Sequence, residues 1–283
     1  GVALRDPLAD LAFDLPDRAR DVGLDLGQSS PCDGLGAAPY PSVHPELGVV
    51  VTARNEAARL PATIAALAGA LPGARIVVAD DASTDATAAA ARGAGAEVVS
   101  APVPLGKGGA ATLGARALLD GRPLRVVVLC DGDLGASAGA LTGLPEALER
   151  GRGDLAVAAF AQREGGGFGL ALAAARWAVA RATGLRPRAS LSGQRALRAA
   201  DLPALLPFAP GYGMEVGMTI DAHRAGLRLV EVELPLAHRA TARTPAGFAH
   251  RARQLLDVLR AARGRGAATT AARRAAASHP GGR

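Results

Sequence analysis

Arg125-Val126-Val127-Val128-Leu129-Cys130-Asp131-Gly132-Asp133-Leu134 is the stretch from which the rest of the chain can be placed. Its short apolar, β-branched run predicts a strand that is buried on both faces, as in a parallel sheet. The run stops at two carboxylates, Asp131 and Asp133, which are separated by one glycine. Ligands bind at the carboxyl edge of such sheets, and two close carboxylates can hold a divalent cation that bridges to phosphate oxygens. The alternative is that both aspartates begin the next helix, because Asp is a good N-cap.

A strand followed by a helix is a pattern that repeats along the chain from Leu47. The short spacing predicts an α/β fold, Rossmann-like, with a mostly parallel sheet and helices on both faces. The expected strands are roughly 47–52, 75–79, 96–100, 126–130, 154–160 and 228–234, and the expected helices roughly 57–70, 82–92, 105–119, 138–150, 169–183, 215–225 and 248–262.

Composition divides the chain into three parts. Residues 1–45 contain six prolines and no sustained period, so we expect a loosely structured extension. Residues 46–263 form the predicted α/β domain, with a first half at 46–135 and a second half at 136–263. The Ala/Arg/Gly tail at 264–283 has no core-forming residues and is expected to be disordered.

Composition also excludes several classes of protein. The hydrophobic fraction of 49% argues against a disordered chain, and the aromatic fraction of 3% argues against a stacking platform for single-stranded nucleic acid. The net charge is +6 with the excess late in the chain, which favours phosphate-bearing small molecules over nucleic acid. No signal pattern, membrane-length apolar run or cysteine framework is found, so we expect a soluble cytoplasmic protein without a transmembrane segment. Peripheral membrane contact through the basic helix at 248–262 and a homodimeric assembly both stay open.

Lys107 is the only lysine in the chain, and the other long basic side chains are all arginines. A chain so rich in arginine keeps a lysine where a compact point charge is needed in place of a planar fork, or by chance. The surrounding Gly106-Lys107-Gly108 lacks the first glycine and the hydroxyl of an ATPase phosphate loop. A lysine between glycines at a helix start still suits a diphosphate.

Other polar positions each allow two interpretations. Asp80 and Asp81 end a strand, where carboxylates can hold a ribose or a base edge, but they can also cap the helix that follows. Glu215 lies near a helix start, where a carboxylate is favoured electrostatically whatever its function. His238 follows the last expected strand, and a single histidine is more often structural than a ligand.

A second group of residues follows strands that should end on the same sheet edge as Asp133. The turn Gly165–Gly167 can hold an anion with its backbone N–H groups, and Arg163 can grip a phosphate or carboxylate with two hydrogen bonds. The alternative is an ordinary flexible loop with a solvated arginine. The residues considered for this anion-binding pocket are Arg163, Gly166, Ser192, Gly193 and Gln194.

Taken in order, these motifs resemble those of family-2 nucleotide-sugar glycosyltransferases with the GT-A fold. The matching segments are Thr52-Ala53-Arg54-Asn55-Glu56, Asp80–Asp85, Gly106–Gly108 and Asp131–Asp133, and the resemblance covers residues 48–254. It implies a donor site for a UDP- or GDP-linked sugar. The residues that the resemblance places in the donor site are Thr52, Arg54, Asn55, Glu56, Asp80, Asp81, Lys107 and Asp131.

The second half is similar to the glucosyl-3-phosphoglycerate synthases, through Leu191–Gln194, Pro207–Gly217 and Ala237–Arg239. This similarity implies Mg²⁺ or Mn²⁺ as cofactor, Lys107 on the donor diphosphate, and a small anionic acceptor in the pocket named above. The implied metal ligands are Asp131, Asp133 and His238. The family usually has Glu where this chain has Gln194, and the residues after Arg239 also depart from its pattern, so the two departures concern the acceptor.

The implied reaction is the attack of an acceptor hydroxyl on the anomeric carbon of the donor sugar, with Asp133 and Glu215 as the catalytic residues. If the reaction inverts configuration, Glu215 is the expected general base. If it retains configuration, as in the synthases, no protein base is required. The alternatives are a polyprenyl-phosphate glycosyltransferase and a relative that binds nucleotide sugars without catalysis.

Overall fold

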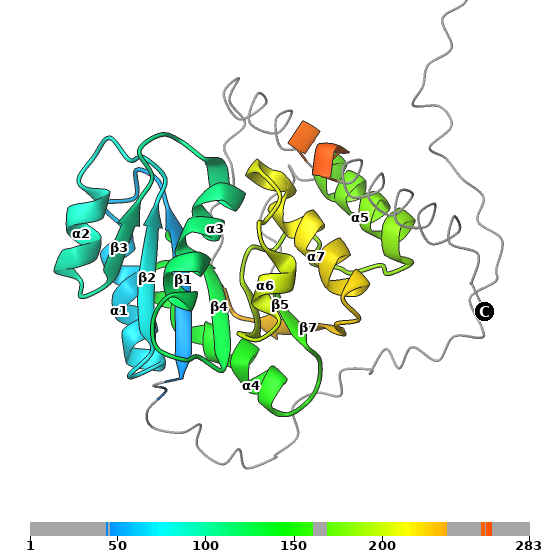
Figure 1. Cartoon of the computed structure of the whole chain (residues 1–283), viewed down its shortest axis with the longest axis horizontal. Coiled ribbons are helices and arrows are strands. Elements are labelled where there is room, and N and C mark those ends of the chain that lie inside the picture. Colours follow the sequence, from blue (N-terminus) through cyan, green and yellow to red (C-terminus); the bar gives the residue numbers. More distant parts are fainter. Residues whose placement is uncertain (1–43, 45, 161–168, 237–255, 258, 262–283) are drawn as a thin grey trace, which may run out of the picture. The chain divides into compact units, whose positions relative to one another are not determined.

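The computed structural model describes residues 44, 46–160, 169–236, 256, 257 and 259–261, which all belong to one unit within residues 40–283. Within them, seven strands form one mixed sheet in the order β3-β2-β1-β4-β6-β5-β7 (Figure 1). The predicted α/β class is therefore confirmed. Nearly all of the predicted extension, the predicted tail and most of the predicted basic helix lie outside the described residues.

The first half of the sheet consists of four parallel strands, each with a run of small or β-branched apolar residues. β1 lies between β2 and β4, and β3 pairs with the outer side of β2. The register places Thr52 opposite Asp131 and Ala53 opposite Asp80, so the strands end at one shared edge. The elements are β1 (Leu47–Ala53), α1 (Leu60–Ala70), β2 (Arg75–Asp80), α2 (Thr87–Gly93), β3 (Glu97–Ser100), α3 (Gly106–Leu119) and β4 (Val126–Asp131).

In the second half, one short strand runs against its neighbours. β6 is antiparallel to both β4 and β5, whereas β5 and β7 are parallel to each other. Because β6 is reversed, the residues just before it lie at the edge where β4 ends. The elements are η2 (Gly135–Thr142), α4 (Gly143–Glu149), β5 (Leu155–Phe160), α5 (Gly169–Thr183), β6 (Arg195–Arg198), α6 (Leu202–Leu205), η3 (Gly211–Gly213), α7 (Met214–Arg224) and β7 (Leu229–Leu234).

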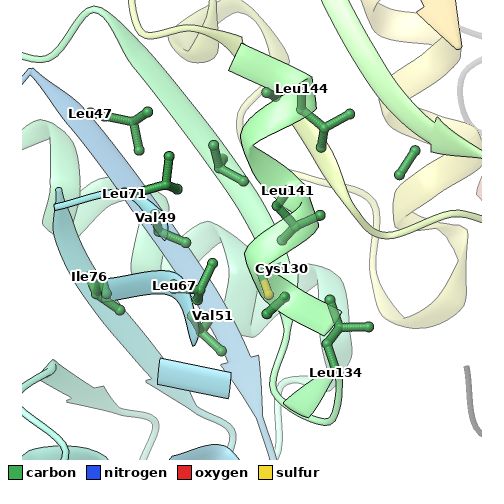
Figure 2. Packing of buried hydrophobic residues seen from close by; sticks show 14 of the residues in the cluster. Leu47, Val49, Val51, Leu67, Leu71, Ile76, Cys130, Leu134, Leu141 and Leu144 are labelled. Atoms are coloured by element: carbon green, nitrogen blue, oxygen red, sulfur yellow. The ribbon is translucent and has the colours of Figure 1, made fainter. Parts of the chain in front are cut away.

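The core has one layer on each face of the sheet, because alternate strand residues point to opposite faces. Val49 and Val51 pack with α1, η2 and α4 residues such as Leu67 and Leu141 (Figure 2). Val50, between them, packs on the other face with the small residues of α3 and with Met218 of α7. The prediction that helices cover both faces is confirmed.

The structure differs from the prediction at two elements, one predicted helix and one strand that was not predicted. The helix expected at 138–150 is a 3₁₀ segment, η2, followed by the short α-helix α4. Glycines at Gly139 and Gly143 weaken a continuous helix here, and Pro145 has no N–H to donate. Strand β6 was not predicted, because four residues of the sequence Arg-Ala-Leu-Arg carry too little periodic signal. No helix in the described ranges is long and apolar enough to cross a membrane.

Candidate active site

Five of the predicted site residues meet at the carboxyl edge of the sheet. Thr52 is near the end of β1 and Asp131 ends β4, directly opposite each other in the register. Lys107 comes from the first turn of α3, and Glu215 from the first turn of α7. Gln194 immediately precedes β6. The edge therefore gathers side chains from four elements and from the segment before β6.

Lys107 is clamped between two carboxylates. Its Nζ lies 2.8 Å from Oδ1 and 3.0 Å from Oδ2 of Asp131, and 2.8 Å from Oε1 of Glu215. Burial alone would lower the pKa of Lys107, but the charges of Asp131 and Glu215 outweigh it and raise that pKa well above its ordinary value. The two carboxylates therefore favour the charged ammonium form of Lys107.

Asp131 also accepts hydrogen bonds from two further side chains. Gln194 Nε2 donates to its Oδ2 at 2.8 Å, and Thr52 Oγ1 donates to its Oδ1 at 3.4 Å. Burial would raise the pKa of Asp131, but the Lys107 charge and these hydrogen bonds hold it below its ordinary value. Asp131 is thus an ionised carboxylate at the centre of the cluster.

Gly193 packs directly against this ion pair. A Cβ at this position would collide with Nζ of Lys107 and lie 2.9 Å from Oδ2 of Asp131. The next residue, Gln194, is oriented by Ser192, whose hydroxyl donates to Gln194 Oε1 at 3.2 Å. The predicted Ser192-Gly193-Gln194 segment therefore borders Lys107 and Asp131.

Asp133 occupies a different position from Asp131, although only one residue separates them. It is partly exposed, and no described side chain donates a hydrogen bond to it. In the described ranges, no group of three or more His, Cys, Asp and Glu side chains is arranged to hold a metal ion. His238, the third predicted ligand, lies outside the described residues, as do Arg163 and Gly166 of the predicted acceptor pocket.

The carboxylates that end β2 are used differently, because they accept main-chain N–H groups. Asp80 Oδ1 accepts from the amide of Ser83 at 3.1 Å. Asp81 accepts from the amides of Leu105 and Gly106 at 2.5 and 3.0 Å. Both aspartates are buried. Asp81 thus fixes the segment that leads into α3 and Lys107.

The Thr52–Glu56 motif is tied to the loop after β2. Asn55 has a positive φ of 55°, and its Oδ1 accepts from the amide of Thr84 at 2.9 Å. The amide of Glu56 donates to Thr87 Oγ1 at 2.8 Å, and its carboxylate pairs with Arg59 at 3.1 Å. Arg54 is exposed. These contacts tie the end of β1 to the loop that follows β2.

One residue of the site, Arg195, was not predicted from the sequence. Arg195, the first residue of β6, is fully buried, and its guanidinium donates to the backbone carbonyl of Ser192 and to the hydroxyl of Thr219. Its position next to Gln194 was the only sequence signal. An arginine in a four-residue strand gives no indication of where its side chain points.

Chemically, the edge presents an ammonium held between two carboxylates in the N-terminal turn of a helix. A helix N-terminus and an ammonium together favour a phosphate group. The neighbouring carboxylates favour cations and can accept protons. The arrangement suits a diphosphate-bearing ligand.

Comparison with protein families agrees with a site that suits a diphosphate-bearing ligand. The model of glycosyl transferase family 2 matches residues 48–196, which is more than half of the chain. The chain belongs to glycosyl transferase family 2. It is therefore a glycosyltransferase, as predicted, and the matched range spans β1 to β6.

Individual relatives agree with this assignment. An undecaprenyl-phosphate mannosyltransferase of Micrococcus luteus is 32% identical over 208 residues, which cover 67% of this chain and 83% of the relative. The glucosyl-3-phosphoglycerate synthase of Mycobacterium tuberculosis in complex with phosphoglyceric acid matches with a TM-score of 0.64 at 30% identity, over 77% of this chain and 79% of that one. The same synthase with Mn²⁺, UDP-glucose and phosphoglyceric acid gives a TM-score of 0.62 at 30% identity, over 76% and 79%. The predicted GT-A-like fold is confirmed.

Proposed function

We propose that this glycosyltransferase moves a sugar from a UDP- or GDP-linked donor to a small anionic acceptor, with a divalent cation at the end of β4. The observation that carries the proposal is the ammonium of Lys107, held within 3.0 Å of Asp131 and Glu215 at the N-terminus of α3. Two carboxylates hold this cation at one position, so its charge acts on a ligand at a defined place. An ion pair on the open surface would contribute little, but here the carboxylate of Glu215 is buried.

The diphosphate of the donor belongs at Lys107. An ammonium in the first turn of a helix adds to the favourable field of the helix N-terminus. The segment leading into α3 is held by Asp81, which therefore sets the approach of the phosphates. The residues assigned to the donor are Thr52, Arg54, Asn55, Glu56, Asp80, Asp81, Lys107 and Asp131.

The residues at the end of β4 fit a hard divalent cation. Carboxylate oxygens are the ligands that Mg²⁺ and Mn²⁺ prefer, and Asp131 and Asp133 supply them. Structures of the M. tuberculosis synthase contain Mn²⁺ or Mg²⁺ together with UDP, which supports this assignment. Asp133 is the more available carboxylate, because Asp131 already accepts from Lys107 and Gln194. We assign His238 as the third ligand. When bound, the cation neutralises charge on the departing diphosphate.

We assign Glu215 to the acceptor side of Lys107. Its carboxylate is buried, and its Oε1 lies 2.8 Å from Nζ of Lys107. In an inverting reaction, Glu215 accepts the proton of the attacking hydroxyl. In a retaining reaction, its role is to hold Lys107 on the leaving diphosphate.

The acceptor carries a phosphate or carboxylate in this proposal, at Arg163, Gly166, Ser192, Gly193 and Gln194. Two phosphate-bearing acceptors follow from the two kinds of relative. The synthase was crystallised with phosphoglyceric acid, and the M. luteus relative is a mannosyltransferase for undecaprenyl phosphate. The phosphoglycerate-like acceptor is the first candidate, because the similarity to the synthase extends into the second half of the fold.

A donor and acceptor screen read out by mass spectrometry tests the proposal. UDP-glucose, GDP-glucose and GDP-mannose are each incubated with Mn²⁺ and either 3-phosphoglycerate or a polyprenyl phosphate. We expect one donor to give a product heavier than the acceptor by one hexose, and we expect Asp133→Ala to abolish it. Asp154→Asn, at the opposite edge of the sheet, is the control that keeps activity. A wild-type protein that binds nucleotide but releases none with any pair would be a non-catalytic relative.

A further inference from the structure

Arg195 is a buried charge for which neither donor nor acceptor binding accounts. It lies in the middle of the sheet, opposite Leu129 of β4 and Val157 of β5, and its exposed fraction is 0%. Burial lowers the pKa of Arg195 to about 10, although the charges of Glu215 and Glu231 act to raise it. Burying a guanidinium is costly, and a well-packed apolar side chain at such a position is often at least as stable. Its presence therefore calls for a role other than stability.

One side of the guanidinium holds the segment before β6. Nε of Arg195 donates to the backbone carbonyl of Ser192 at 2.9 Å. The hydroxyl of Ser192 donates to Oε1 of Gln194, which leaves Nε2 of that amide to donate to Asp131. An amide side chain can face either way, so this sequence of contacts decides that Gln194 presents a donor to Asp131.

The other side of the guanidinium holds the start of α7. Nη1 of Arg195 donates to Oγ1 of Thr219 at 3.0 Å, and Thr219 Oγ1 donates to the backbone carbonyl of Glu215 at 2.9 Å. The side chain of Glu215 pairs with Lys107, and Lys107 pairs with Asp131. The two sides therefore meet again at the same aspartate.

These contacts form a closed ring that joins the end of β4, the segment before β6, α7 and α3. Its four charged side chains, two acidic and two basic, sum to zero. The members in order are Asp131, Gln194, Ser192, Arg195, Thr219, Glu215 and Lys107.

Arg195 is the most deeply buried member of the ring, with an exposed fraction of 0%. Its Nη2 has no hydrogen-bond partner in the described part of the chain. A buried donor without a partner is unfavourable, and structures keep such groups where another requirement outweighs the loss. The requirement here is that two elements, the segment before β6 and α7, are held by one rigid, planar group.

We propose that Arg195 is a positioning residue, which closes this ring and thereby holds Gln194 and Glu215 in place against Asp131 and Lys107. The inference rests on the proposed function for its kinetic consequence, since the ring surrounds the residues assigned to transfer. Arg195 does not touch substrate in this account. It acts through the orientation of the groups that do.

Replacement of Arg195 tests the proposal in the full-length protein. For Arg195→Met, we expect kcat for sugar transfer to fall by about thirtyfold or more, while the Kd for UDP or GDP with Mn²⁺ changes by less than about threefold. Arg195→Lys keeps the charge but cannot reach both partners as a fork does, so we expect it to restore only part of kcat. A purely structural arginine would lower thermal stability without separating kcat from nucleotide affinity.

Arg75→Met is the matched control. Arg75 is another largely buried arginine, which pairs with Glu97 and donates to the backbone carbonyls of Ala117 and Leu118, at the start of β2 and away from the site. We expect it to lower the melting temperature and leave kcat within about twofold of wild type. If Arg195→Met folds poorly, Thr219→Val opens the ring at one link with little change in shape, and a smaller fall in kcat is expected.

Crystal structures of Arg195→Met or Thr219→Val give a readout that does not depend on turnover. We expect the Gln194–Asp131 or the Lys107–Glu215 contact to be lost. Unchanged contacts, or a wild-type kcat in folded Arg195→Met, would overturn the positioning role. A wild-type enzyme that transfers no sugar would instead overturn the proposed function, and the crystal structures would still decide whether Arg195 holds the ring.

Discussion

The strands β2 and β4 both end in aspartates, but the aspartates accept hydrogen bonds from different kinds of donor. At the end of β2, Asp80 and Asp81 accept the main-chain N–H groups of nearby loops. At the end of β4, Asp131 accepts the side chains of Lys107, Gln194 and Thr52. The aspartates after β2 fix the backbone of loops, and the aspartate that ends β4 fixes side chains, including the charged Lys107.

The difference shows which carboxylates should matter for chemistry and which for shape. A carboxylate that caps backbone amides contributes about 0.5–2 kcal/mol and can be replaced with limited damage. Removing one partner of a buried ion pair costs about 3–5 kcal/mol, because it leaves an uncompensated charge. The β4 end should therefore be sensitive in activity, and the β2 end mainly in stability and loop order.

The largest expected effect is that of Lys107→Met. The substitution leaves the partly buried Asp131 and the buried Glu215 without their shared cation, and it removes the positive charge assigned to the diphosphate. We expect kcat/KM to fall by about a thousandfold, with a loss of about 3–5 kcal/mol in the free energy of unfolding. Enzyme kinetics and urea denaturation measure the two. Lys107→Arg keeps the charge but changes its shape, and near-normal activity in that variant would contradict the requirement for a compact cation.

A smaller effect is expected from Gly193→Ala, which disturbs the β4 end without removing a charge. The added methyl would meet Nζ of Lys107 and Oδ2 of Asp131, which are side-chain ends and not backbone, so the ion pair must shift while the fold is kept. We expect kcat/KM to fall by about ten- to a hundredfold, with a change in melting temperature of no more than about 2 °C. Gly69→Ala on α1 is the control, because a Cβ there meets nothing within 4 Å. Equal activity in both variants would show that the ammonium's position is not critical.

Asp81→Ala probes the β2 end directly. The amides of Leu105 and Gly106 lose their acceptor, so we expect a loss of about 1–2 kcal/mol in stability and a several-fold rise in donor KM. The kcat should change little, because Lys107 keeps both carboxylates. Thermal denaturation and donor titration at saturating acceptor provide the measurements. A loss of kcat as large as that of Lys107→Met would remove the distinction between the two strand ends.

The smallest effect on activity is expected from Asp154→Asn, at the opposite edge of the sheet. Asp154 accepts hydrogen bonds from Arg228 and Arg198. The hydrogen bond from Arg228 is the main cause that lowers the pKa of Asp154 to about 2. Because this folded-state pKa lies below the unfolded value, the stabilisation is present above about pH 4 and is lost as the pH falls towards 2. With both arginines substantially exposed, we expect Asp154→Asn to cost about 1 kcal/mol at pH 7.

Urea denaturation at several pH values checks this prediction. The stability difference between wild type and Asp154→Asn should shrink below pH 4 and vanish near pH 2, and activity at pH 7 should not change. A difference that persists at pH 2 would mean that the aspartate acts through packing. A change in activity would mean that a well-paired carboxylate far from Lys107 also matters for transfer.

Much of the fold could be predicted from local pattern. The apolar runs of β1, β2 and β4 indicated buried parallel strands, because a strand covered on both faces needs apolar residues at successive positions. The carboxylates that end β2 and β4 indicated the edge at which the candidate site residues gather, and the glycines around Lys107 indicated the start of α3. The order of these motifs also indicated the family, which the match over residues 48–196 confirms.

Tertiary structure alone decided which charges meet. The sequence showed that Lys107, Asp131 and Glu215 were notable, but it could not show that one ammonium contacts both carboxylates, since they are far apart along the chain. The reversal of β6 and the burial of Arg195 were likewise invisible, because a four-residue strand lacks periodicity and its neighbours in the sheet are distant in sequence. Local sequence determines which residues form an element and which edge they end at. The partners that a buried charge finds depend on how distant elements pack.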